Sequence, residues 1–178
     1  MRPIARLLIP ALVFLSIAAA PALAARKPVY SSIVVDANTG EVLHAISPDT
    51  KTYPASTAKI MTLYLLFEAM AKGRLKMDTM LRVSDAAAAQ APSKLGLDAG
   101  KTIAVRDAML AVVTKSANDM AVVLAEGIAG GESAFAERMT AKARQLGMKN
   151  TRFKIASGLP DPDQTTTARD LATLGMAV

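Results

Sequence analysis

The pattern of apolar and polar positions divides the chain into a short stretch of strands followed by a long series of helices. Residues 31–35 and 41–46 are typical of strands, and between them Asn38 and Gly40 tolerate the positive φ of tight turns. This stretch therefore predicts a β-hairpin. Because an isolated hairpin is only marginally stable in water, its strands are expected to need partners in a larger sheet, and the rest of the sequence shows no such sheet.

After Pro54 the sequence pattern indicates helices rather than strands. Proline disfavours the α conformation in the residue before it, so a helix should begin after Pro54 and carry the nearly all-apolar run 60–71 into a buried position. Further helices are predicted at residues 84–91, 106–114, 119–128, 133–146 and from 167 onward, with extended pieces at 80–83, 102–105 and 152–155. Two apolar groups each fall roughly on one helix face: Phe135, Met139 and Ala143, and Ile103, Leu110 and Val113. The middle of the chain should form a helical bundle.

The first 24 residues have the composition of an export signal rather than of a folded segment. Arg2 and Arg6 form a basic start, residues 7–20 are apolar, and Ala22-Leu23-Ala24 is a small-x-small cleavage site. A transmembrane anchor is the alternative, but the apolar run is short for a span of about 20 residues. We therefore expect an exported protein, in the periplasm or on the outer face of the cytoplasmic membrane, whose single domain is residues 25–178.

Composition narrows the chemistry that is open to this domain. Lys and Arg outnumber Asp and Glu by 21 to 15, but the basic residues are scattered and the chain has no Trp, so no nucleic acid is expected as a partner. A mildly basic exported protein suits an anionic cell-wall or membrane surface. The chain has no Cys, and its one histidine, His44, lies in a predicted strand. We expect no metal or other cofactor, and a serine nucleophile would have to take lysine as its base.

A serine and a lysine stand three positions apart at the start of the apolar helix, as Ser56 and Lys59. Residues at this spacing share a helix face, so their side chains can meet. Serine is a weak nucleophile unless a neighbour takes its proton, and burial lowers the pKa of lysine from its ordinary value of about 10.4. The backbone N–H of Ser56 is a candidate oxyanion donor. The alternative is that Ser56 caps the helix and Lys59 is a solvated residue of the first turn.

A second polar group, Ser116-Ala117-Asn118, interrupts two predicted helices. The structural interpretation is a helix cap made by Ser116 or Asn118. The functional interpretation is a loop that carries a hydroxyl and an amide into a cleft facing Ser56 and Lys59.

With these motifs in place, the sequence resembles the D-alanyl-D-alanine carboxypeptidases, low-molecular-mass penicillin-binding proteins of the serine DD-peptidase and β-lactamase superfamily. That superfamily combines Ser-x-x-Lys with Ser-x-Asn and Lys-Thr-Gly. The resemblance extends over nearly all of residues 25–178. The matching stretches are residues 35–43, Tyr53-Pro54-Ala55-Ser56-Thr57-Ala58-Lys59, Ser116-Ala117-Asn118-Asp119, residues 146–153, Gly158-Leu159-Pro160-Asp161 and residues 167–172.

The resemblance implies a fold and a role for each motif residue. The fold would be α+β, an antiparallel sheet covered by helices with a helical lobe at about residues 84–150. Ser56 would attack the penultimate D-alanine of a peptidoglycan stem peptide ending in D-Ala-D-Ala, and Lys59 would take its proton. Ser116 would bridge to Lys59 and protonate the leaving D-alanine, while Asn118 would bind the peptide backbone. β-Lactams would act as covalent inhibitors.

The third motif of the family is missing from these 178 residues. Lys101-Thr102-Ile103 precedes the second motif and has isoleucine where a residue without a side chain is needed. We therefore expect an incomplete domain without its C-terminal strands, its second oxyanion donor and the group that holds the substrate carboxylate. Loss of one oxyanion donor alone costs about 10²–10³ in kcat, so this chain should be inactive by itself. The sequence does not tell whether a C-terminal segment associates with a membrane surface, since such a segment would follow Val178.

Two other functions stay open. A β-lactamase shares the acylation step but needs a further base for deacylation, and beyond Ala136 the candidates are Glu137 in a predicted helix and Asp161 and Asp163 in a loop. The other is a non-catalytic fragment or pseudoenzyme that only binds cell-wall peptide.

Overall fold

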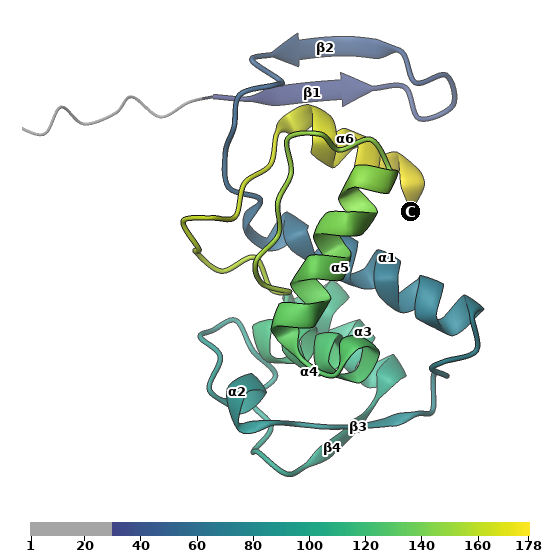
Figure 1. Cartoon of the computed structure of the whole chain (residues 1–178), viewed down its shortest axis with the longest axis vertical. Coiled ribbons are helices and arrows are strands. Elements are labelled where there is room, and N and C mark those ends of the chain that lie inside the picture. Colours follow the sequence, from purple (N-terminus) through teal and green to yellow (C-terminus); the bar gives the residue numbers. More distant parts are fainter. Residues whose placement is uncertain (1–29) are drawn as a thin grey trace, which may run out of the picture.

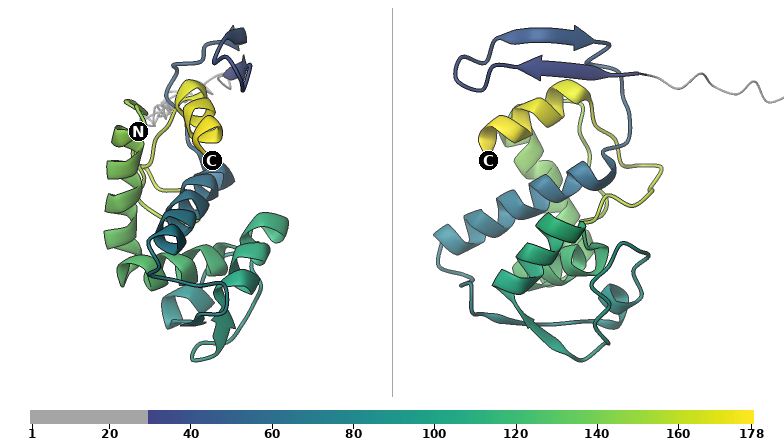
Figure 2. Two further views of the ribbon diagram at one scale, coloured as in Figure 1. Left: turned by 90° about the vertical axis from the view of Figure 1, so that its right-hand side faces the viewer. Right: turned by 180° about the vertical axis from the view of Figure 1, so that it is seen from behind.

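The computed structural model describes residues 30–178, so the predicted export signal at residues 1–24 lies outside the described part of the chain. A hairpin lies at one end of the long axis and a second strand pair at the other, with helices between them (Figures 1 and 2). In chain order the elements are β1 (Ser32–Val35), β2 (Val42–Ile46), the 3₁₀ helix η1 (Ala55–Thr57), α1 (Ala58–Ala71), β3 (Met80–Arg82), α2 (Asp85–Ala88), β4 (Thr102–Ala104), α3 (Val105–Lys115), α4 (Asn118–Ala129), α5 (Glu132–Gln145) and α6 (Ala168–Ala177).

The predicted N-terminal hairpin is confirmed. Strands β1 and β2 pair antiparallel, with Val34 opposite His44. In the turn, the carboxylate of Asp36 accepts the backbone N–H of Thr39 at 2.8 Å, and Gly40 has φ 76°, which other residues rarely adopt. One face of the hairpin lies over α6, while β2 is exposed along its whole length (Figure 1).

A second antiparallel pair, β3 with β4, joins the two extended pieces that the sequence predicted separately. Leu81 lies opposite Ile103, and both side chains are buried against the helices. The sequence did not predict this pairing because each strand is only three residues long and a loop with α2 intervenes. Within residues 30–178 each sheet has two strands, so the larger sheet expected for the hairpin is not found in this part of the chain.

Helix α4 is the centre of the core. Each residue from Asn118 to Ala125 is buried, because α4 packs against α1, α2, α3, α5 and β3. The predicted stripe on α5, formed by Phe135, Met139 and Ala143, is fully buried as expected. Helix α1 lies between α6 and the α3–α4 pair (Figure 2), and this arrangement buries one side of the helix that follows Ser56.

One predicted face is wrong. Leu110 and Val113 of α3 were expected to share a face with Ile103, yet they are 46% and 60% exposed while Ile103 is buried. The buried side of α3 is instead formed by Val105, Ala108, Ala111 and Val112, two of which are alanines. Small side chains allow helices to approach closely, and the sequence interpretation gave more weight to the larger apolar residues.

No helix among residues 30–178 is long and apolar enough to cross a bilayer. The division of the chain into a sheet region and a lobe at about residues 84–150 stays a prediction.

Candidate active site

The turn that carries Ser56 is a short 3₁₀ helix leading directly into α1. Pro54 begins this helix, and Ala55 has φ 47°, a left-handed conformation that costs energy for a residue with a side chain. The cap positions are Pro54 for η1 and Thr57 for α1, and neither helix start is capped by a side-chain hydrogen bond. Ser56 is therefore not a helix cap, and its exposed hydroxyl is left to other partners.

Lys59 lies one turn further on, with its amine in the interior. The residue is 4% exposed, and its Nζ lies 2.8 Å from Oδ1 of Asn118, 2.7 Å from the carbonyl oxygen of Ser157 and 3.4 Å from Oγ of Ser56. Burial lowers the pKa of Lys59 to about 8, because desolvation disfavours the ammonium form. The alternative of a solvated first-turn lysine is thereby excluded.

All three contacts of Nζ are with oxygens that can accept a hydrogen bond, so the ammonium form can donate to all three and the neutral form to two of them. A neutral amine has two N–H donors and one lone pair, whereas an ammonium has three donors and no acceptor. The two short bonds, to Asn118 and Ser157, use both donors of the neutral form. The lone pair then remains for the hydroxyl of Ser56 at 3.4 Å. The arrangement can therefore remove a proton from Ser56.

The Ser116-Ala117-Asn118 group connects α3 to α4. Ser116 ends α3 in a left-handed conformation, φ 55°, and Ala117 occupies the N-cap position of α4 without a side-chain cap. Neither Ser116 nor Asn118 caps α4, so the cap interpretation is wrong here. Ser116 was expected to contact the amine of Lys59, but within the described part of the chain Lys59 forms no hydrogen bond with it. Asn118 contacts the amine instead.

The amide of Asn118 is held at both of its polar atoms. Oδ1 accepts from Lys59, and Nδ2 donates to the carbonyl of Ala91 at 2.8 Å. Because an amide nitrogen has two hydrogens, one N–H remains that can reach a ligand. The next residue, Asp119, is fully buried and accepts the backbone N–H groups of Leu95 and Gly96, which fixes the loop opposite Ser56.

Three of the four predicted residues line one pocket together with residues 157–162, a segment that the sequence placed in a loop. The pocket has a volume of about 710 Å³, and its wall is largely apolar. Ser56, Ser116 and Asn118 line it, and Lys59 lies beneath them. Residues 157–162 form the far wall. Asp161, in this wall, carries the one carboxylate among the described residues that line the pocket.

Gly158 brings that wall against the nucleophile turn. It has φ 81°, and a Cβ placed on it would lie 1.8 Å from the carbonyl oxygen of Ala55. Only glycine fits this approach. The sequence signal that could have indicated the contact was the Ser157-Gly158 pair in the predicted loop, but its partner across the fold is not visible in the sequence.

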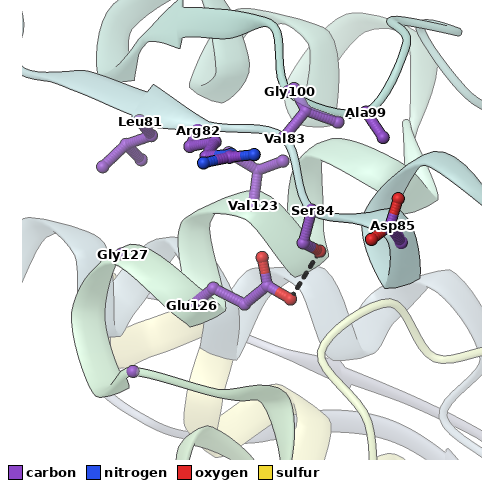
Figure 3. A pocket seen from close by; sticks show the side chains of 11 residues that line it. Leu81, Arg82, Val83, Ser84, Asp85, Ala99, Gly100, Val123, Glu126 and Gly127 are labelled. Carbon is purple, nitrogen blue, oxygen red and sulfur yellow. Dashed lines mark hydrogen bonds between the residues drawn. The ribbon is translucent and has the colours of Figure 1, made fainter.

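A second pocket of about 640 Å³ lies between the β3–β4 pair and α4 (Figure 3). Its polar groups include Arg82, Asp85 and Glu126, and Ser84 donates a hydrogen bond to Glu126 at 2.8 Å. The oxygen of Ser84 also accepts the N–H of Ala87 and so caps α2. Within residues 30–178, no three His, Asp or Glu side chains lie close enough together to hold a metal ion.

The chain is similar in sequence and in fold to several known proteins. The sequence profile of the D-alanyl-D-alanine carboxypeptidase family matches residues 16–178. D-alanyl-D-alanine carboxypeptidase DacF of Bacillus subtilis (strain 168) is 36% identical over 144 residues, which are 81% of this chain and 37% of that protein. The crystal structure of D-alanyl-D-alanine carboxypeptidase DacD from Francisella tularensis has a TM-score of 0.80 and 36% identity, and the match covers 83% of this chain and 36% of that one.

A further solved structure is similar. Penicillin-Binding Protein D2 from Listeria monocytogenes, in its cefotaxime bound form, has a TM-score of 0.72 and 30% identity, over 85% of this chain and 64% of that one. The chain spans about 37% of the length of the Bacillus subtilis relative and of D-alanyl-D-alanine carboxypeptidase DacA from Haemophilus influenzae. The α+β fold expected from the resemblance is confirmed by these neighbours.

Proposed function

The chain belongs to the D-alanyl-D-alanine carboxypeptidase family, and from this premise we propose that its pocket serves a serine-type D-Ala-D-Ala carboxypeptidase acting through an acyl-enzyme on Ser56. The observation that carries the proposal is the amine of Lys59, buried, with a pKa lowered to about 8, and 3.4 Å from the Ser56 hydroxyl. The substrate is a peptidoglycan stem peptide that ends in D-Ala-D-Ala.

In the first step Ser56 Oγ forms a bond to the carbonyl carbon of the penultimate D-alanine. Its proton passes to the lone pair of neutral Lys59, and the carbonyl oxygen becomes an oxyanion. The backbone N–H of Ser56 is free to point toward that oxygen, because the first N–H groups of a helix have no partner within the helix. At pH 7 about a tenth of Lys59 is neutral, given its pKa of about 8.

In the second step the bond between the carbonyl carbon and the leaving nitrogen breaks. We assign to Ser116, on the same pocket wall, the delivery of a proton to the departing D-alanine, and to the remaining N–H of Asn118 a hydrogen bond to the peptide carbonyl. The product is an ester on Ser56, which water then hydrolyses. A β-lactam follows the same first step, and its ester persists because the amine stays attached.

The compartment and the surroundings of the enzyme belong to the same proposal. Residues 1–24 would direct export, and the substrate lies outside the cytoplasmic membrane. Family members require a Lys-(Thr/Ser)-Gly motif that is not among these 178 residues. Activity measurements therefore use the full in-frame product of the gene, with residues 25–178 alone as a comparison that we expect not to react.

The test is covalent labelling by a fluorescent penicillin. We expect a stable label on the in-frame product and on a Ser84→Ala control, whose hydroxyl lies in the second pocket, and no label on Ser56→Ala. Rapid release of the label from the unaltered protein would indicate a β-lactamase. An unaltered product that takes no label at all, or a labelled Ser56→Ala, contradicts the proposal.

A further inference from the structure

Thr62 is a buried polar residue to which the proposed chemistry gives no role. It lies on α1 three positions after Lys59, and its side chain is fully buried. A threonine inside a helix commonly returns its hydroxyl to the carbonyl four residues earlier. Thr62 instead donates across the fold to the carbonyl of Ala156, at 2.8 Å. The hydroxyl therefore ties α1 to the wall of the catalytic pocket.

The carbonyl next to that of Ala156 is the one that receives the lysine. Ser157 O accepts from Lys59 Nζ at 2.7 Å. Two side chains one helical turn apart, Thr62 and Lys59, thus hold two consecutive carbonyls of residues 155–158, called here the Ser157 segment. If the bond from Thr62 is lost, the Ala156–Ser157 peptide is no longer held from α1, and the carbonyl of Ser157 that follows it can turn away from the amine.

The Ser157 segment is also held from its other side. The carboxylate of Glu132, at the start of α5, accepts the N–H of Ala156 at 2.9 Å. Gly158 lies against the carbonyl of Ala55, as described above. The Ser157 segment therefore has one anchor on α1, one on α5 and one on the nucleophile turn.

We propose that Thr62 is a positioning residue, whose hydroxyl fixes the Ser157 segment so that one N–H of Lys59 is taken up and its lone pair is directed at Ser56. The inference rests on the proposed role of Lys59 as the proton acceptor for Ser56. It concerns the hydroxyl and not the volume of the side chain, because valine has nearly the same shape as threonine.

The direct readout is the protonation of Lys59, which requires no turnover. The protein is labelled with ¹³Cε lysine, the Lys59 signal is assigned by its absence in Lys59→Arg, and its shift is followed with pH. In Thr62→Val the ammonium loses a well-placed acceptor, so the pKa of Lys59 should fall by about half a unit or more below that of the unaltered protein. Thr62→Ser keeps the hydroxyl and should restore the unaltered value.

The same variants give a kinetic readout with penicillin. We expect Thr62→Val to be acylated about tenfold more slowly, in line with a small displacement of a catalytic group, and Thr62→Ser to react close to the unaltered rate. Circular dichroism checks that both variants are folded. A second pair, Glu132→Ala with Glu132→Gln as its control, loosens the same segment from α5, since glutamine keeps an acceptor oxygen for Ala156.

The outcomes separate this inference from the proposed function. If the pKa of Lys59 in Thr62→Val equals or exceeds the unaltered value, or if Thr62→Ser shifts it as much as valine does, the positioning role is overturned. Should Thr62→Val fail to fold, an unchanged Lys59 pKa in Glu132→Ala overturns it equally. A lowered pKa in a protein that penicillin never labels would leave the positioning intact and remove the carboxypeptidase.

Discussion

Two serine hydroxyls of this molecule each lie beside a charged side chain in a pocket, and the two pairs differ in every respect that matters for catalysis. Ser56 lies 3.4 Å from the amine of Lys59 in a pocket of about 710 Å³. Ser84 lies 2.8 Å from the carboxylate of Glu126 in a pocket of about 640 Å³. By distance alone the second pair is the better candidate, and the two pockets are of similar volume.

The hydrogen bonds and the basicity of the two pairs favour Ser56 and Lys59 instead. The oxygen of Ser84 is occupied by the N–H of Ala87, and a carboxylate is in general a weaker base than an amine. The Ser56 hydroxyl caps no helix, and burial lowers the pKa of Lys59 to about 8. We therefore expect the reactive pair to be the one with a free hydroxyl and a base whose charged form is disfavoured, rather than the one with the shortest distance.

The largest contrast is expected when the base of each pair is changed. Lys59→Arg keeps the charge but cannot become neutral, since a guanidinium stays protonated throughout the pH range in which proteins are folded. Acylation by penicillin should fall about 10³-fold, the usual contribution of a general base. Glu126→Gln, the matched change in the second pocket, should leave the rate unaltered. Comparable rates in Lys59→Arg and the unaltered protein would remove Lys59 from the mechanism.

Each pocket has a glycine that lies close to another part of the chain, Gly158 in the first and Gly127 in the second. A Cβ on Gly158 would lie 1.8 Å from a backbone oxygen at φ 81°, whereas one on Gly127 would meet the end of the Leu81 side chain at 2.7 Å. Backbone cannot move aside as a side chain can. We expect Gly158→Ala to slow acylation about 10²-fold through displacement of the nucleophile turn.

The matched change, Gly127→Ala, should be tolerated by rotation of Leu81 and should leave acylation close to the unaltered rate. Stopped-flow acylation and thermal unfolding measure both variants. Equal losses in the two would show that the approach of Gly158 to Ala55 has no special part in the site.

The next prediction concerns how the acylation rate and the stability depend on pH. Lys59 must be neutral to accept a proton, so acylation should rise about tenfold per pH unit at low pH and level off above about pH 8. The folded-state pKa of Lys59 lies below its unfolded value near 10.4, so the unfolded chain binds more protons between them and stability should increase from pH 8 toward pH 10. A pH–rate profile that is flat from pH 6 to 9 contradicts the assignment.

Several helices, the hairpin turn and the proximity of Ser56 to Lys59 could be predicted from the sequence. The apolar run of α1 after Pro54, the helical patterns of α4 and α5 and the turn at Gly40 are local signals, and they gave elements within a residue or two of those observed. The spacing of Ser56 and Lys59 on one helix fixed their proximity, since residues three apart share a face.

The remaining features depend on contacts between distant parts of the chain. The carbonyl of Ser157 meets Lys59 across 98 positions, and Thr62 meets Ala156 across 94. Neither contact has a periodic signal, because a backbone carbonyl is present at every residue. The pairing of β3 with β4 and the burial of small residues on α3 were missed for the same reason: both depend on what packs against them.

The smallest effect is expected in the second pocket, where Ser84 serves structure. Ser84→Ala removes the cap of α2 and leaves the N–H of Ala87 without its acceptor, which should cost about 1 kcal/mol of stability. For a domain of this size that lowers Tm by about 2–4 °C. Ser84→Thr keeps the capping oxygen and should retain most of the stability, while both variants acylate normally. A slower acylation in Ser84→Ala would mean that the second pocket communicates with Ser56, and the two pairs could no longer be treated as independent.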